Sequence, residues 1–117
     1  MKKIILTIAI SCLFSTALMA KEAIKQNDNE HSCRGLMSMA SMIMSKRQEG
    51  VPLEAMLIAT DKVKKDGISK DASDAFRQII IDAYSQPAYS TSKYQLESIN
   101  DFSSKYYINC MKGFGLA

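Results

Sequence analysis

Two cysteines place the strongest constraint on the fold of this chain. Cys33 and Cys110 lie near the two ends of its polar, helix-forming region. An even pair of cysteines in an oxidising compartment most simply forms a disulfide, which would bring those two ends together. The alternative is a pair of free buried thiols, which would require the chain to stay in the cytoplasm.

The N-terminus indicates export. A short basic start precedes a mostly apolar segment, 4–18, which is closed by small residues before the composition turns polar at Lys21. This order predicts a secretory signal peptide over 1–20. Cleavage after Ala20 fits the change of composition best, and cleavage after Ala17 is the alternative.

The length and charge of this segment favour a Gram-negative periplasm as the location. The apolar segment is short for a membrane-spanning helix, which needs roughly 20 apolar residues. We therefore expect no stable membrane insertion once the signal is removed. Secretion, an uncleaved anchor and a lipid-anchored form through Cys12 remain alternatives.

The remaining chain is predicted to be a disordered leader, 21–29, followed by a single helical domain, 30–117. Loss of the two signal lysines changes 15 basic against 12 acidic residues to 13 against 12, a net charge of +1. No basic run is longer than two residues, so a nucleic-acid partner is not expected.

Apolar residues at three- and four-residue spacing predict four helices and no strand. They cover 31–48, the segment from Pro52 to the stop at Gly67, 70–85, and the segment from Ser92 to the stop at Gly113. Short connections favour an up-down-up-down arrangement, so the fold class is all-α, a small four-helix antiparallel bundle stapled by one disulfide. In such a bundle Cys33, near the start of the first helix, and Cys110, near the end of the fourth, lie at the same end.

The sequence also predicts helix caps and the residues on the buried face of each helix. Ser69 is predicted to cap the third helix, and the Ser92–Gln95 spacing predicts a capping box at the fourth. The buried faces are expected to include Leu53, Val63, Ala75 and Leu96.

Four methionines lie close together in the first predicted helix. Projection at 100° per residue places Met37 and Met44 on the core face with Cys33, Met39 at its edge and Met42 on the opposite side. Because they do not converge, core packing is favoured over a Cu(I) site, and no metal or other cofactor is expected.

A surface for an unknown protein partner is the second interpretation of the exposed apolar residues. The candidates are Met39, Met42, Ile58, Ile81 and Tyr89. Tyr89 lies in the loop between the third and fourth helices, where an aromatic side chain on a rigid scaffold is typical of binding elements. Whether the protein forms a homodimer is left open.

The catalytic inventory is poor, and we expect a non-enzyme. His31 precedes Cys33 by two residues, a pairing that could activate a thiol, but Cys110 offers that cysteine a disulfide partner. No phosphate-binding glycine loop, serine-hydrolase motif or zinc-protease motif occurs.

The spacing of several structural residues resembles that of small exported helical proteins of proteobacteria. The pattern consists of Cys33, Met37, Arg47-Gln48-x-Gly50, Met56, Ala83-Tyr84-x-x-Pro87, Phe102, Tyr106 and Cys110. The resemblance implies fold and location, without a catalytic or binding residue. In design the chain is also similar to periplasmic immunity proteins against cell-wall amidases and to small acid-stress chaperones.

The expected function is therefore that of a small exported periplasmic protein that acts by binding another protein. An immunity or inhibitor protein against a secreted cell-wall enzyme, or a periplasmic stress chaperone, is the alternative. A methionine-based Cu(I) carrier is the least favoured.

Overall fold

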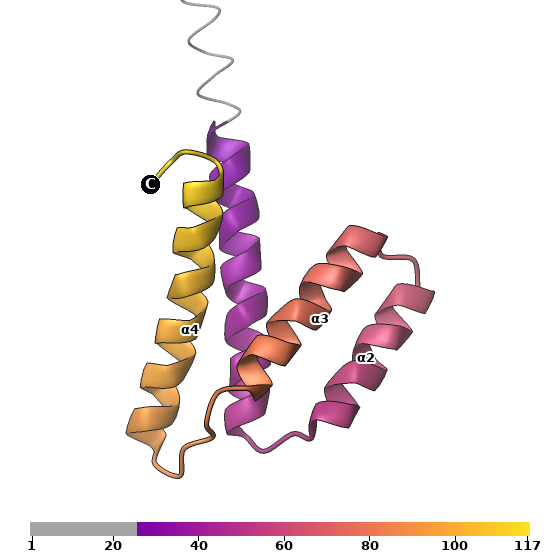
Figure 1. The fold of residues 1–117 in the computed structure, drawn as a ribbon, viewed down its shortest axis with the longest axis vertical. Coiled ribbons are helices and arrows are strands. Elements are labelled where there is room, and N and C mark those ends of the chain that lie inside the picture. The colour runs from indigo at the N-terminus through magenta and orange to yellow at the C-terminus, as the bar shows by residue number, and fades with distance from the viewer. Residues whose placement is uncertain (1–25) are drawn as a thin grey trace, which may run out of the picture.

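The computed structural model describes residues 26–117, and the predicted signal peptide with Cys12 lies outside this part (Figure 1). The described residues form four helices joined by short loops, with no strand among them. They are an N-terminal helix over 26–48, α2 (Leu53–Lys65), α3 (Lys70–Tyr84) and α4 (Ser92–Gly113). The prediction of an all-α fold is confirmed.

The N-terminal helix includes residues that we had expected in the disordered leader. Residues 26–29 are helical, so the predicted leader was wrong for these four. A side-chain pair one turn apart favours this helical start: the Arg34 guanidinium donates to the Glu30 carboxylate at 3.0 Å. Such pairs stabilise a helix at its start.

The local cap predictions had different outcomes. Ser69 caps α3 as predicted, because its hydroxyl accepts a hydrogen bond from the Ala72 amide at 3.2 Å. The capping box of α4 is absent: Thr91 occupies the N-cap position without a side-chain cap. The Gln95 amide instead donates to the Tyr89 carbonyl at 2.7 Å.

The N-terminal helix and α4 lie side by side and antiparallel, while α2 and α3 form a hairpin that tilts away from them (Figure 1). The chain alternates in direction from helix to helix, as predicted. The Cys33–Cys110 disulfide joins the first and last helices, with 5.5 Å between the two Cα atoms and a sequence separation of 77. The predicted disulfide is thus confirmed.

The core lies where the hairpin meets the N-terminal helix and α4. Its buried residues are Ala40, Ile43, Met44, Met56, Ile79, Ile80, Ala83 and Phe102. Because the hairpin is tilted, several residues assigned to buried faces are left in solvent. Leu53, Val63 and Leu96 are 42%, 38% and 59% exposed, and Ala75 is exposed as well, so these four assignments were wrong.

A polar contact ties α4 to α3. The Tyr106 hydroxyl donates to the Asp82 carboxylate at 2.8 Å, and the Lys105 ammonium lies 3.5 Å from the same carboxylate. Burial raises the pKa of the Tyr106 phenol, and the hydrogen bond and negative charge of Asp82 raise it further.

Between residues 26 and 117, no helix has both the length and the apolar character that crossing a bilayer requires.

Candidate functional site

The C-terminal end of the N-terminal helix holds the loop between α3 and α4, residues 85–91. The Arg47 guanidinium donates two hydrogen bonds, at 3.2 and 3.1 Å, to the Gln86 carbonyl. The Gln48 side chain, which is only 7% exposed, binds the loop at two points. Its amide nitrogen donates to the Pro87 carbonyl at 2.9 Å, and its oxygen accepts from the Tyr89 amide at 2.8 Å.

A second contact fastens the other side of this junction. The Tyr84 hydroxyl donates to the Val51 carbonyl, and the Arg47 guanidinium lies over the Tyr84 ring, 5.2 Å from its centroid. Burial raises the pKa of the Tyr84 phenol, and the positive charge of Arg47 partly opposes this.

The structure therefore brings together two parts of the sequence pattern noted above. The Arg47-Gln48-x-Gly50 turn and the Ala83-Tyr84-x-x-Pro87 segment meet through these contacts. Gly50 adopts φ 86°, the left-handed conformation that lets the chain leave the N-terminal helix at this turn. The sequence shows both segments but does not reveal that they contact each other.

The loop forms one side of a hollow of about 360 Å³, which we name the tyrosine hollow. Its lining residues are Met44, Gln86, Tyr89, Tyr94, Glu97, Ser98, Asp101, Phe102 and Lys105. Met44 and Phe102 belong to the buried core, whereas Tyr89 and Tyr94 are 41% and 52% exposed. The two tyrosine rings are tilted toward each other, with 6.0 Å between their centroids.

The charged residues of the tyrosine hollow come from one face of α4. Glu97 and Asp101 are separated by one helical turn, and neither forms an ion pair within the described part of the chain. Lys105, one turn further, is paired with Asp82 instead. The Lys93 ammonium lies 5.9 Å from the centroid of the Tyr94 ring.

Sequence reasoning identified only Tyr89 among these lining residues. A usable signal was present, because Tyr94, Glu97, Asp101 and Lys105 follow one another at spacings of three and four, which places them on one face of a helix. What the sequence did not reveal is that the loop folds over this face.

The methionines divide between the core and a second hollow. Met44 is buried, Met39 packs against the edge of the core, and Met42 is 47% exposed, all as predicted. Met37 was predicted to be in the core, but it is only partly buried. Met37 and Met42 instead line a hollow of about 530 Å³, which is completed by Ser38, Ser41, Asn100, Ser103 and Ser104.

The five residues proposed as a partner surface are thus distributed over the molecule. Met42 and Tyr89 line different hollows, and Met39 is largely covered. Ile58 and Ile81 are 61% and 57% exposed on α2 and α3, and they line neither of these hollows. Of the five, Tyr89 is the one whose backbone is held by a buried side chain and whose ring lies beside a second tyrosine.

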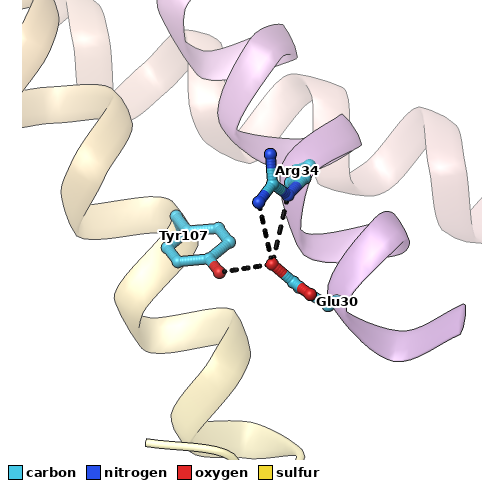
Figure 2. Close-up of polar contacts among 3 residues, drawn as sticks. All are labelled: Glu30, Arg34 and Tyr107. Carbon is cyan, nitrogen blue, oxygen red and sulfur yellow. Dashed lines mark hydrogen bonds and ion pairs between the residues drawn. The ribbon is translucent and has the colours of Figure 1, made fainter. Parts of the chain in front are cut away.

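The disulfide end of the molecule carries a separate polar cluster (Figure 2). One Glu30 carboxylate oxygen accepts hydrogen bonds from Arg34 at 3.2 and 3.0 Å and from the Tyr107 hydroxyl at 3.3 Å. The hydrogen bonds and charge of Arg34, with a smaller contribution from Tyr107, lower the pKa of Glu30. The cluster fastens the N-terminal helix to α4.

Cys33, considered above as a nucleophile, has no free thiol because it forms the disulfide. Cys33 is fully buried and bonded to Cys110, while His31 is exposed. Over residues 26–117, no three side chains among His, Cys, Asp and Glu gather as a metal site would require.

Comparison of this chain with protein-family models, with curated proteins and with solved structures found no match.

Proposed function

We propose that this protein is an exported, non-enzymatic binding protein of the periplasm, and that a partner protein docks over the tyrosine hollow. The observation that carries the proposal is the use of a buried amide to hold an exposed aromatic loop. The Gln48 side chain forms hydrogen bonds with the Pro87 carbonyl and the Tyr89 amide of the loop. The Tyr89 ring lies beside the Tyr94 ring at the surface.

Two physical arguments connect this geometry to binding. Tyrosine is enriched at the centres of protein interfaces, because its ring buries a large area and its hydroxyl retains a polar contact. A loop that is already ordered loses less conformational entropy on association than a flexible one. The loop 85–91 is ordered by Arg47, Gln48 and Gln95 from two different helices.

The disulfide supports the exported location. A crosslink between Cys33 and Cys110 forms and persists most readily in an oxidising compartment such as the periplasm. The predicted signal peptide over 1–20 agrees with this location.

Site-specific photo-crosslinking in the periplasm of the producing cell tests the proposal. A benzoylphenylalanine at position 89 should give a crosslinked partner, because Tyr89 lies in the proposed interface. The same residue at position 58 is the control, since Ile58 is more accessible than Tyr89 (61% against 41% exposed) but lies on α2, outside the tyrosine hollow. Failure to obtain an adduct at position 89 across growth conditions, or identical adducts at both positions, would contradict the proposal.

An inhibitor or immunity protein against a secreted cell-wall enzyme is the second candidate. The ordering of loop 85–91 favours it, because inhibitors commonly dock with little change of backbone conformation. Addition of the purified protein to a peptidoglycan-hydrolysis assay with periplasmic extract should then slow hydrolysis. The Tyr89→Ala variant should slow it less, and equal effects of the two proteins would count against this role.

A further inference from the structure

We infer that the tyrosine hollow receives an arginine side chain of the partner protein. This inference rests on the proposed function and specifies the chemistry of the docking contact. It follows from three properties of the hollow: its carboxylates, its ring faces and its size.

The first property is a pair of carboxylates that form no ion pair within the described part of the chain. Glu97 and Asp101 point from one face of α4 into the same hollow. Like charges one helical turn apart repel each other. A cation placed between them would relieve that repulsion, and Lys105 is already engaged by Asp82.

The second property is the presence of two aromatic faces beside these carboxylates. Tyrosine rings attract cations within about 6 Å of the centroid. The Lys93 ammonium lies 5.9 Å from the Tyr94 centroid, so a cation at this ring is compatible with the fold, and an arginine of the partner would have to displace or accompany it. Tyr89 provides a second tilted ring, and the pair forms one side of a site for a flat, positively charged group.

The third property is size. The hollow is open on one side and has a volume of about 360 Å³, near the lower limit of roughly 300 Å³ for ligand pockets, which is enough room for one long side chain. Its apolar base, Met44 and Phe102, would contact the methylene stem of such a side chain.

Arginine fits these properties better than lysine. Its guanidinium is planar and stacks on aromatic rings, and its five N–H groups can donate to two carboxylates at once. An ammonium is a more strongly hydrated point charge, which would lose more solvation on entering the hollow.

Titration of the isotope-labelled protein with short blocked peptides, followed by amide chemical shifts, tests this inference. The probe is a Gly-Arg-Gly peptide, and a Gly-citrulline-Gly peptide is the uncharged control of nearly the same shape. The arginine peptide should shift the amides of Tyr89, Tyr94, Glu97 and Asp101 in a saturable way. The citrulline peptide should bind about tenfold more weakly, because it lacks the charge.

Matched variants separate local from general electrostatics. Glu97→Gln combined with Asp101→Asn should weaken arginine-peptide binding by about tenfold. Glu54→Gln combined with Asp71→Asn removes the same charge from exposed positions outside the hollow, and it should leave binding unchanged.

Three results would overturn the inference: equal binding of the arginine and citrulline peptides, shifts confined to residues outside the hollow, or equal binding of a Gly-Lys-Gly peptide. The proposed function is tested separately by crosslinking. A partner crosslinked at position 89 without any response to the arginine peptide would refute the arginine contact and keep the binding role. Arginine binding without a crosslinked partner would do the reverse.

Discussion

The buried amide of Gln48 is the contact on which the loop depends most, and its replacement by leucine gives the clearest test. Leucine is slightly shorter and can still pack against Met44, but it cannot form the hydrogen bonds of the amide, including the one from the Gln48 nitrogen to the Met44 sulfur at 3.5 Å. The Pro87 carbonyl and the Tyr89 amide would each lose their partner. At about 0.5–1.5 kcal/mol for each hydrogen bond, Gln48→Leu should lower the free energy of unfolding by about 2 kcal/mol.

Urea denaturation with the disulfide intact measures the global part of this loss. Amide hydrogen exchange measures the local part, because a loop can open while the helices stay packed. We expect the Tyr89 amide to exchange markedly faster in the Gln48→Leu variant, while amides in the core, such as that of Ile80, change only as far as the global stability changes.

The matched control is Gln95→Leu. Gln95 also binds the backbone of Tyr89, but it donates to the carbonyl at an exposed position, where water can replace it. Its replacement should cost less than about 1 kcal/mol. If Gln48→Leu costs no more than Gln95→Leu and the Tyr89 amide stays protected, the reasoning that this loop is held by a buried amide is refuted.

Three further predictions concern the core, the disulfide and alkaline pH. Met44→Ala should cost about 2–5 kcal/mol in thermal or urea unfolding, whereas Met42→Ala should stay within about 0.5 kcal/mol; similar costs would contradict their separation. Replacement of Cys33 and Cys110 by serine should cost on the order of 4 kcal/mol in the same assay, since the crosslink closes a loop of 77 residues; an unchanged unfolding midpoint would refute this. The raised pKa of Tyr106 keeps its proton in the folded state where the unfolded chain loses it, so stability should fall as pH rises above about 10. Tyr106→Phe should flatten that fall when unfolding is measured from pH 9 to 11, and an unaltered slope would exclude Tyr106 as its source.

The helical periodicity predicted the number and order of the helices, because amphipathic spacing is a local property of the chain. It also separated Met44 from Met42, since helical projection determines which side of a single helix a residue occupies. The disulfide was predicted from an even pair of cysteines in an exported chain, and the helix order agreed with that prediction. Cys33 and Cys110 lie at the ends of the first and last helices, and an alternating bundle brings those ends together.

The site was much less predictable, because it depends on contacts between distant segments. Gln48 reaches a loop 39 to 41 positions further along the chain, and nothing in its own surroundings distinguishes it from a solvent-exposed glutamine. Leu96 is the opposite case, since it was predicted to be buried and is exposed. It was assigned to the apolar stripe of α4, but its side chain is 59% exposed, because the neighbouring N-terminal helix contacts α4 through other residues such as Ser98.

The disulfide lies at the end of the N-terminal helix that the apolar core does not reach. The buried apolar residues of the N-terminal helix that join the core, Ala40, Ile43 and Met44, all lie in its second half. Between residues 26 and 39 the only buried side chain is that of Cys33. At that end the crosslink to Cys110 and the contact of Glu30 with Tyr107 hold the helix against α4 in place of an apolar core. Loss of the disulfide should therefore expose the amides of residues 26–39 to exchange well before those of 40–48, whereas uniform exchange along the helix would contradict this division.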